Sequence, residues 1–291
     1  FSDNNIGPQI YGTFDNGMIT HYIDGETVTD EVLGTKEMCY MEIARIFAKI
    51  HTVKLCKYGK EFNPNQAIVK QRLYEWLETS AKVFHTEMNF QCNKQNWAFL
   101  NARNPDNISN EAYHSFIKNE LNWLFHKIET FPLKDITKIV CCHNDMHSLN
   151  ILKLNKYKNK YGIIDLDYAG YNYNCFDLGN YFNEISIDND YPSSNGFRIH
   201  HDKFPTPQYQ QQFLKEYFIH LMGNTQYNSN NMDNKMNEIL LGIQYGVCLS
   251  HIHWGIWGIN ESIRRSKSWN YLEYGRQRLL SYIELKQNLT S

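Results

Sequence analysis

The sequence predicts an α+β fold, in which a small antiparallel β part near the N-terminus precedes a larger, mainly helical part. Three observations carry this prediction. Residues 9–24 alternate around the hairpin signal Asp15-Asn16-Gly17. Much of the chain after residue 37 repeats apolar side chains at helical spacing. Among these segments, the apolar runs 139–142 and 151–152 enclose a short polar loop, the kind of place where a rigid scaffold presents functional side chains.

The individual elements follow from these patterns in chain order. The N-terminal hairpin consists of two strands, the second covering residues 18–24. Apolar periodicity predicts helices over 38–51, 66–90 and 110–130. Residues 152–164 form a second hairpin, and a turn at 168–173 leads into a helix that carries Asp177 and Glu184 on one face. A long loop at 187–207 precedes helices over 207–222, 230–262 and 268–288.

Composition and charge exclude several classes of partner. The 291 residues are 42% hydrophobic, which is enough to build an ordered core, and the formal net charge is −2. A charge this small creates no field that attracts nucleic acid or an anionic membrane surface, so we expect neither as a partner. The seven cysteines form no CxxC pair, which is typical of a reducing compartment. We therefore expect a cytoplasmic protein.

The segment Ile239–Ile259 is the most membrane-like stretch of the sequence. Gln244, Ser250, His251 and His253 interrupt it. Polar and ionisable side chains are costly in lipid, so a buried helix of the core is the better interpretation. No stable membrane insertion is expected.

The polar loop contains Asp145 and Asn150, which are separated by four residues. The same D-x-x-x-x-N spacing occurs in kinase catalytic loops, where the aspartate accepts the proton of the substrate hydroxyl and the asparagine holds a metal ion. Alone, the pattern is weak evidence, because Asp and Asn recur in turns for backbone reasons.

A second motif strengthens the first. The segment Tyr161–Asp167 is a short strand that ends in two carboxylates, Asp165 and Asp167. Carboxylate oxygens suit Mg²⁺ on a nucleotide. Because a hairpin joins the two motifs, together they strongly indicate Mg²⁺-dependent phosphoryl transfer.

Two aromatic pairs lie near the C-terminus. Trp254 and Trp257 are three residues apart on one predicted helix, and Tyr271 and Tyr274 are three apart on the next, so each pair shares a face. Core packing is the usual role of aromatic residues at this spacing. Aromatic faces also enclose cations, however, and an aromatic cage is a common binding site for quaternary ammonium groups. With carboxylates elsewhere in the chain, a cationic substrate is the sharper hypothesis.

The sequence contains neither G-x-G-x-x-G nor G-x-x-x-x-G-K. If the protein is a kinase, the loop that covers the phosphates and the lysine that binds them lie upstream of Phe1 or are absent. In the second case the chain would be a pseudokinase, a non-catalytic module that binds its ligand without transferring phosphate.

Five blocks of sequence together resemble the choline/ethanolamine kinases, a family similar to the aminoglycoside phosphotransferases. The resemblance runs from about Gly7 to Leu285, and its blocks are His143–Asn150, Ile164–Tyr173, Phe176–Glu184, Ser250–Trp257 and Tyr271–Tyr274. It implies a protein-kinase-like fold, with residues 1–24 as the end of the small N-terminal lobe and the hinge, and residues 25–291 as the helical catalytic lobe. It also implies transfer of the γ-phosphoryl group of ATP, with Mg²⁺, to choline or ethanolamine. That reaction is the first step toward phosphatidylcholine or phosphatidylethanolamine.

The resemblance assigns roles residue by residue. Asp145 matches the base that accepts the hydroxyl proton, and Asn150 and Asp165 match the Mg²⁺ ligands, so these three are the catalytic residues. Tyr22 and Ile23 fall at the hinge, where backbone groups bind adenine, and Asp165 contacts the nucleotide through the metal. The residues that would bind the amino alcohol are Asp145, Asp167, Tyr168, Glu184, Trp254, Trp257, Tyr271 and Tyr274.

Some positions depart from the family pattern. Asp167 stands where the family usually has Glu and is one methylene shorter. Choline kinases commonly have Trp and Tyr after the pocket glutamate, where this chain has Ile185 and Asn189, with Tyr191 two residues further on. Other segments match either branch of the family, so choline and ethanolamine both stay open. The alternative is another small-molecule kinase of the aminoglycoside phosphotransferase type. The resemblance further implies a homodimer.

Overall fold

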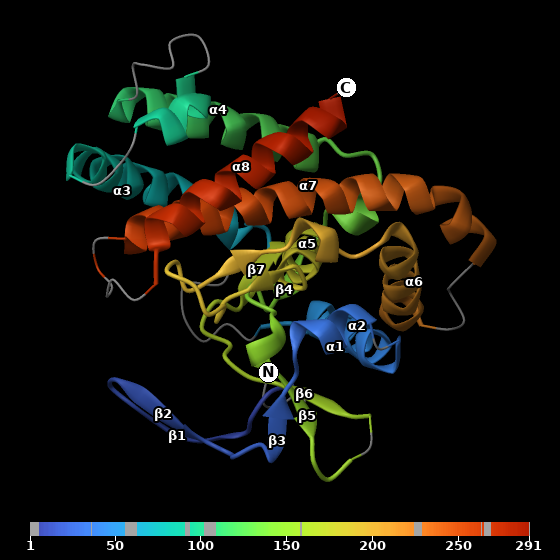
Figure 1. Cartoon of the computed structure of the whole chain (residues 1–291). Coiled ribbons are helices and arrows are strands. Elements are labelled where there is room, and N and C mark those ends of the chain that lie inside the picture. Colours follow the sequence, from blue (N-terminus) through green and yellow to red (C-terminus); the bar gives the residue numbers. More distant parts are fainter. Residues whose placement is uncertain are drawn as a thin grey trace. The chain divides into compact units, whose positions relative to one another are not determined.

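The computed structural model describes residues 6–35, 37–55, 63–90, 94–101, 109–157, 159–223, 229–262, 264 and 269–290 (Figure 1). The chain forms two compact units. The first unit comprises residues 1–67, 133–187 and 200–246, and the second comprises residues 68–132, 188–199 and 247–291. The lobe boundary expected at residue 24 stays a prediction.

The N-terminal hairpin of the first unit is confirmed. Strand β1 (Ile10–Phe14) pairs antiparallel with β2 (Gly17–Thr20) around the predicted turn. The prediction that the second strand continues to residue 24 is wrong, because β2 ends at Thr20. After four residues outside any strand, the chain forms β3 (Gly25–Thr27), which pairs instead with β5 (Ile151–Leu154). Alternation alone does not reveal this change of pairing partner, because β5 lies more than 120 residues away.

Two further strand pairs frame the polar loop. Strand β5 pairs antiparallel with β6 (Tyr161–Ile163), which confirms the second hairpin. Strand β4 (Ile139–Cys142) pairs with β7 (Gly170–Tyr173), and helix α5 (Asn174–Glu184) follows β7 directly. The interpretation of residues 168–173 as a turn missed β7, since glycine and asparagine are weak strand formers and only pairing with β4 makes the segment extended.

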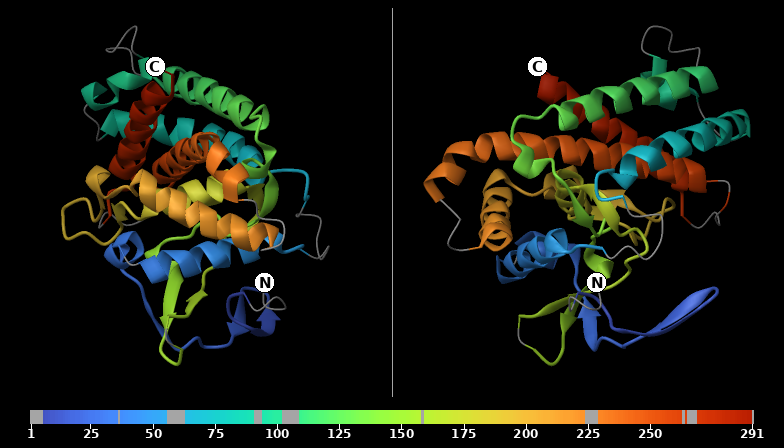
Figure 2. Two further views of the ribbon diagram at one scale, coloured as in Figure 1. Left: turned by 90° about the vertical axis from the view of Figure 1, so that its right-hand side faces the viewer. Right: turned by 180° about the vertical axis from the view of Figure 1, so that it is seen from behind.

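Helices cover the rest of the first unit. They are α1 (Asp30–Thr35), α2 (Glu37–Thr52), α5, α6 (Pro207–Met222) and the part of α7 (Ser229–Glu261) up to Gly246. Helix α2 packs on α6, and the two lie side by side in Figure 2. Phe47 of α2, Tyr181 of α5 and Phe213 of α6 contact one another with ring centroids 5.1–6.0 Å apart. The predicted helix over 38–51 is confirmed, whereas the short α1 was not anticipated.

The second unit is helical. It contains α3 (Ile68–Phe90), α4 (Asn110–Glu129), the remainder of α7 and α8 (Tyr271–Thr290), all predicted from periodicity. Ser109 caps α4 by accepting a hydrogen bond from the Ala112 amide at 3.2 Å. Among the described residues of both units, the shorter elements are the 3₁₀ turns Lys94–Asn101, Lys134–Ile136, Ser148–Asn150 and His201–Lys203, and the two-residue strands Ile187–Asp188 and Arg198–Ile199.

The most apolar helix is α7. Within the described part of the chain, its segment Met232–Glu261 is the one stretch long and apolar enough to cross a membrane by length and composition. Of its most apolar window, 83% is buried inside the fold, as in the core helix of a globular protein.

Gly246 marks the closest approach of α7 to the start of α5. A Cβ atom at this position would lie 1.9 Å from the carbonyl oxygen of Cys175, which is backbone and has no room to move. We therefore expect Gly246→Ala to lower the free energy of unfolding by about 3 kcal/mol, measured by chemical denaturation. Gly12→Ala is the matched control, because a Cβ there meets nothing within 4 Å. Equal stability of the two variants would contradict this close packing.

Candidate active site

The polar loop lies between two buried strands, as predicted. It starts after Cys142 at the end of β4 and ends at Asn150, which directly precedes β5. Two hydrogen bonds tie the loop to itself: the Asp145 amide donates to Nδ1 of His143 at 3.3 Å, and Nδ2 of Asn150 donates to the Asp145 carbonyl at 2.9 Å. The Asp145 side chain is 16% exposed. These hydrogen bonds thus hold Asp145 and Asn150, the two ends of the D-x-x-x-x-N motif, close to each other.

His143 links this loop to the carboxylate strand. Its side chain is buried, and Nε2 donates to the carbonyl oxygen of Ile164 at 3.1 Å while Nδ1 accepts from the Asp145 amide. One ring nitrogen donates and the other accepts, which describes a neutral imidazole. Burial lowers the pKa of His143 and favours the same state. His143 therefore fixes Asp145 relative to the residue just before Asp165 without adding charge.

Two residues of the site have left-handed backbones. Asn144 has φ 68° and Asp165 has φ 59°; among the described non-glycine residues the third case is Asn159, near the tip of a hairpin. Asn144 is held by its side chain, which donates to the Tyr168 carbonyl at 2.9 Å and accepts from Nδ2 of Asn172 at 2.7 Å. Unfavourable backbone conformations persist where the surroundings enforce them, and they concentrate at functional sites.

Asp145 lies in a strongly negative environment. Burial raises its pKa well above the ordinary aspartate value, and the nearby charges of Glu184, Asp165 and Asp177 raise it further. The structure thus brings the predicted residues Asp165 and Glu184 within electrostatic reach of Asp145. Such a group of acids favours binding of a cation, because a positive charge relieves the repulsion. The neighbouring His147 supplies little of that charge, since burial lowers its pKa.

A cavity of about 860 Å³ lies beside the carboxylate strand. This volume falls within the range of small-molecule and cofactor sites. The predicted nucleotide residues Tyr22, Ile23 and Asp165 all line it, as does Asp167. Apolar side chains make up much of the remaining wall, namely Pro8, Ile10, Met18, Leu152, Ile164 and Leu166. Apolar walls beside carboxylates suit a ligand that combines a flat apolar ring system with a charged group bound to a metal ion.

The predicted metal ligands offer the right atoms for Mg²⁺. The hydrogen bond from Nδ2 of Asn150 to the Asp145 carbonyl fixes the orientation of the amide, so Oδ1 is the end turned away from that carbonyl. Asp165 presents an exposed carboxylate at the cavity. Amide and carboxylate oxygens are the hard donors that Mg²⁺ prefers. The residues present therefore fit the ion.

The predicted aromatic residues form one cluster in the second unit. The ring of Trp257 lies 5.3 Å from Trp254, 5.6 Å from Tyr271 and 6.3 Å from Tyr274, measured between centroids. The structure adds two members to the four predicted aromatic residues. Trp269 lies 4.5 Å from Tyr271 and 4.8 Å from Tyr274, and Phe197 lies 5.1 Å from both Trp269 and Tyr274.

Neither added residue shows a periodic signal. The predicted helix over 268–288 included Trp269, but α8 begins at Tyr271, and Trp269 is two and five residues from Tyr271 and Tyr274, which is not helical spacing. Phe197 lies in the long loop. The indole nitrogen of Trp269 donates to the Asn189 carbonyl at 3.2 Å, which ties that loop to the cluster. Tyr191 instead stacks against Arg198 and accepts its hydrogen bond at 2.8 Å. Glu184 and Tyr168 belong to the first unit, so their approach to the cluster stays a prediction.

The chain combines short antiparallel sheets, a mainly helical body and a D-x-x-x-x-N loop that is followed by a carboxylate strand. Together these features define a protein-kinase-like fold. A choline/ethanolamine kinase family model matches residues 1–283, so the chain belongs to the choline/ethanolamine kinase family.

Known proteins that resemble the chain come from both branches of this family. It is 25% identical to mouse choline kinase alpha, covering 99% of this chain and 59% of that protein, and 25% identical to mouse ethanolamine kinase 1, covering 98% and 69%. The crystal structure of a choline kinase from Cryptosporidium parvum is similar with a TM-score of 0.77 at 24% identity, covering 99% of this chain and 76% of that one. The chain thus spans about three fifths to two thirds of the length of these curated relatives.

Proposed function

We propose that the protein transfers the γ-phosphoryl group of ATP to the hydroxyl of choline or ethanolamine, in the cytoplasm, as the first step of head-group synthesis for phospholipids. The observation that carries the proposal is the position of Asp145. It stands on a loop fixed by His143 and Asn150, within electrostatic reach of Asp165 and Glu184. Family membership supports the same reaction.

In the proposed mechanism the chain mainly positions and orients, as expected for a loose phosphoryl-transfer transition state. Asn150 and Asp165 would hold Mg²⁺, which would supply charge neutralisation for the phosphates of ATP. Asp145 orients the substrate hydroxyl and accepts its proton. A carboxylate with a raised pKa is a stronger base than an ordinary aspartate, which favours this transfer. Backbone groups of Tyr22 and Ile23 bind the adenine at the cavity.

The ammonium end of the substrate would be held by acids and aromatic rings. Aromatic faces attract a desolvated cation by about 0.5–2 kcal/mol each. The proposed substrate-binding set is Asp145, Asp167, Tyr168, Glu184, Trp254, Trp257, Tyr271 and Tyr274, and a homodimer is the proposed assembly.

A substrate panel tests the proposal directly. The full-length protein is assayed for ADP release with Mg²⁺-ATP and choline, ethanolamine or an aminoglycoside. We expect turnover with at least one of the two amino alcohols and none with aminoglycosides. Turnover with aminoglycosides alone would place the activity in the other class of small-molecule kinase. Nucleotide binding without any turnover would favour the non-catalytic module.

Trp257 contacts the other three predicted aromatic residues and Trp269. We expect Trp257→Ala to raise the KM for choline about 10-fold, because loss of one cation–π face costs about 1–2 kcal/mol, and to change the KM for ATP little. Initial rates at varied choline and varied ATP measure both constants. Trp123→Ala is the matched control, because Trp123 stacks on lysines elsewhere in the second unit. Equal effects of both variants on the KM for choline would remove the aromatic cluster from the substrate site.

A further inference from the structure

Arg278 carries a charge into the interior of the second unit. The residue lies on α8, its exposure is 0%, and it is among the largest side chains that the fold encloses completely. A buried charge is costly unless hydrogen bonds satisfy it, so the partners of the guanidinium indicate why it is there. One of those partners is a member of the aromatic cluster described above.

The guanidinium joins α7 to α8 beside the aromatic cluster. Its Nη1 donates to the hydroxyl of Tyr274 at 3.0 Å, and its Nη2 donates to Oγ of Ser250 at 2.9 Å. Arg278 follows Tyr274 by four residues on α8, and Ser250 precedes Trp254 by four residues on α7. Side chains four residues apart share one face of a helix. The hydrogen bonds therefore link the two helices one turn away from an aromatic member of each.

Glycines already hold these two helices in close contact. A Cβ atom at Gly275 of α8 would lie 2.7 Å from the carbonyl oxygen of Gly255 on α7, and one at Gly258 would lie 2.8 Å from the carbonyl oxygen of Tyr271. The separation of the two backbones is thus set where these glycines meet. The hydrogen bonds of Arg278 act more locally, on the position of the Tyr274 side chain.

Tyr274 is a central ring of the aromatic cluster. It is buried, and its neighbours include Phe197, Trp257 and Trp269. The guanidinium carbon of Arg278 lies 5.5 Å from the centroid of the same ring. Arg278 therefore contacts Tyr274 both at its hydroxyl and at its ring, and a shift of this arginine would move a ring that packs against three others.

The charge of Arg278 does not attract the proposed substrate. The guanidinium is positive, the amino alcohol also carries a positive charge, and like charges repel. The neighbouring His253 adds no further charge, because burial and the positive charges of Arg72 and Arg278 lower its pKa. A cation that opposes binding, yet donates a hydrogen bond to a ring of the proposed site, is best explained by the position that it gives to that ring.

We propose that Arg278 is a positioning residue that fixes Tyr274 in the ammonium site, with Ser250 orienting the guanidinium. The proposal rests on the proposed function for its effect on amino-alcohol binding, and on geometry alone for its effect on the aromatic cluster. Arginine suits this role because its planar fork donates to two acceptors at once in a fixed geometry.

A double-mutant cycle in the full-length protein tests the proposal. Tyr274→Phe keeps the ring but removes the hydroxyl that accepts from Arg278. We expect Arg278→Met and Tyr274→Phe each to raise the KM for the preferred amino alcohol about fivefold, with kcat and the KM for ATP within about twofold of the wild type. In the Tyr274→Phe background, Arg278→Met should add less than about twofold, because both substitutions remove the same interaction. Effects on KM that multiply would overturn the proposal.

Arg276→Met is the matched control. It makes the same substitution on the same helix, at an arginine whose side chain pairs with Glu273. We expect the KM for the amino alcohol to match that of the wild type. A rise as large as that of Arg278→Met would mean that losing either arginine has the same effect, and the positioning role would fall. If Arg278→Met does not fold, Tyr274→Phe decides alone: an unchanged KM for the amino alcohol would overturn the proposal.

Near-ultraviolet circular dichroism of the ligand-free protein separates this proposal from the proposed function. The signal reports the fixed tertiary packing of aromatic side chains. We expect Arg278→Met to change the near-ultraviolet spectrum and Arg276→Met to leave it unchanged, with equal far-ultraviolet spectra, whether or not the wild type transfers phosphate. An unchanged near-ultraviolet spectrum in Arg278→Met would overturn the positioning role. An inactive wild type in which that spectrum still changes would overturn only the proposed function.

Discussion

Replacing Asp145 by Asn is expected to lower kcat for phosphoryl transfer by about 10³-fold while ATP binding stays nearly intact. Asn has the same shape and can still contact the substrate hydroxyl, but it cannot accept the proton, and general base catalysis contributes about 10²–10⁴-fold. Steady-state kinetics with the preferred amino alcohol give kcat, and calorimetric titration gives the Kd for ATP.

Asp233→Asn is the control for this result, because Asp233 forms an exposed ion pair with Lys215 on the surface of the first unit. Exposed ion pairs contribute little to stability. We therefore expect the kcat and the Kd for ATP of Asp233→Asn to match those of the wild type. Full turnover by Asp145→Asn would remove Asp145 from the role of base.

Asp145→Asn is also expected to stabilise the metal-free protein at neutral pH. The pKa of Asp145 is raised in the fold, so its contribution to stability is present below the ordinary aspartate pKa and is lost as the pH rises through the raised value. At pH 7 the ionised Asp145 side chain therefore lowers the stability of the fold, and Asn avoids this loss. Thermal melts in EDTA should show a higher Tm for Asp145→Asn at pH 7 and a shrinking difference toward about pH 4. A pH-independent difference would contradict this origin.

Asp165→Asn is the second substitution with a large expected effect. We expect kcat at fixed Mg²⁺ to fall about 10³-fold, because a metal ion contributes several kcal/mol of charge stabilisation and the variant loses one anionic ligand. Asn also tolerates the left-handed backbone at φ 59°, so the substitution tests charge rather than strain. Titration of activity with Mg²⁺ should show a higher requirement for the ion.

Asp167→Asn provides the comparison within the same cavity wall. If Asp165 is the metal ligand and Asp167 only contacts substrate, Asp167→Asn should leave the Mg²⁺ requirement unchanged and lower kcat by about tenfold or less. An identical Mg²⁺ shift in both variants would mean that the two carboxylates share the metal.

The sequence by itself determined the features that depend on neighbouring residues. The turn at Asp15-Asn16-Gly17 and the helices at 38–51 and 110–130 follow from turn chemistry and apolar spacing, and the structure places the turn and both helices close to the predicted bounds. The loop that carries Asp145 and Asn150 follows from the same kind of local signal, since two buried runs enclose a polar turn. Side chains near one another in the chain leave a periodic pattern.

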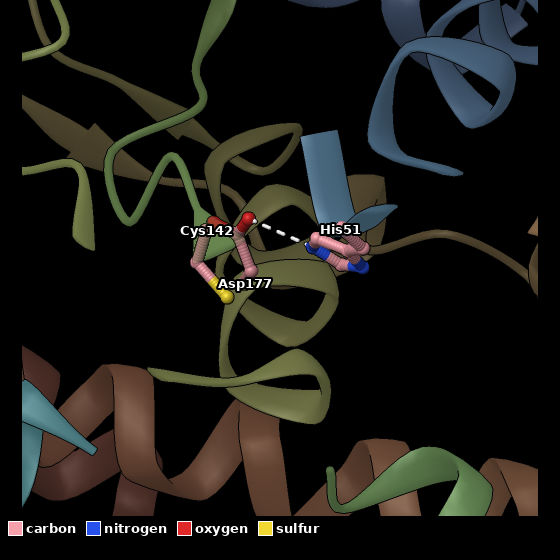
Figure 3. Close-up of side chains that lie close together, drawn as sticks. All are labelled: His51, Cys142 and Asp177. Carbon is pink, nitrogen blue, oxygen red and sulfur yellow. Dashed lines mark hydrogen bonds and ion pairs between the residues drawn. The ribbon is translucent and has the colours of Figure 1, made fainter. Parts of the chain in front are cut away.

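Only the tertiary structure decided the features that join distant segments. From Gly25 the chain pairs with β5 and no longer with β1, and β7 becomes a strand by pairing with β4. Trp269 and Phe197 join the aromatic cluster without any periodic signal. The hydrogen bond between the buried side chains of His51 and Asp177 is of the same kind, because it joins residues 126 positions apart (Figure 3). These long-range pairings depend on which buried groups come into contact when the chain packs, because an unsatisfied donor or carboxylate is costly in the interior. Spacing along the sequence does not determine those contacts.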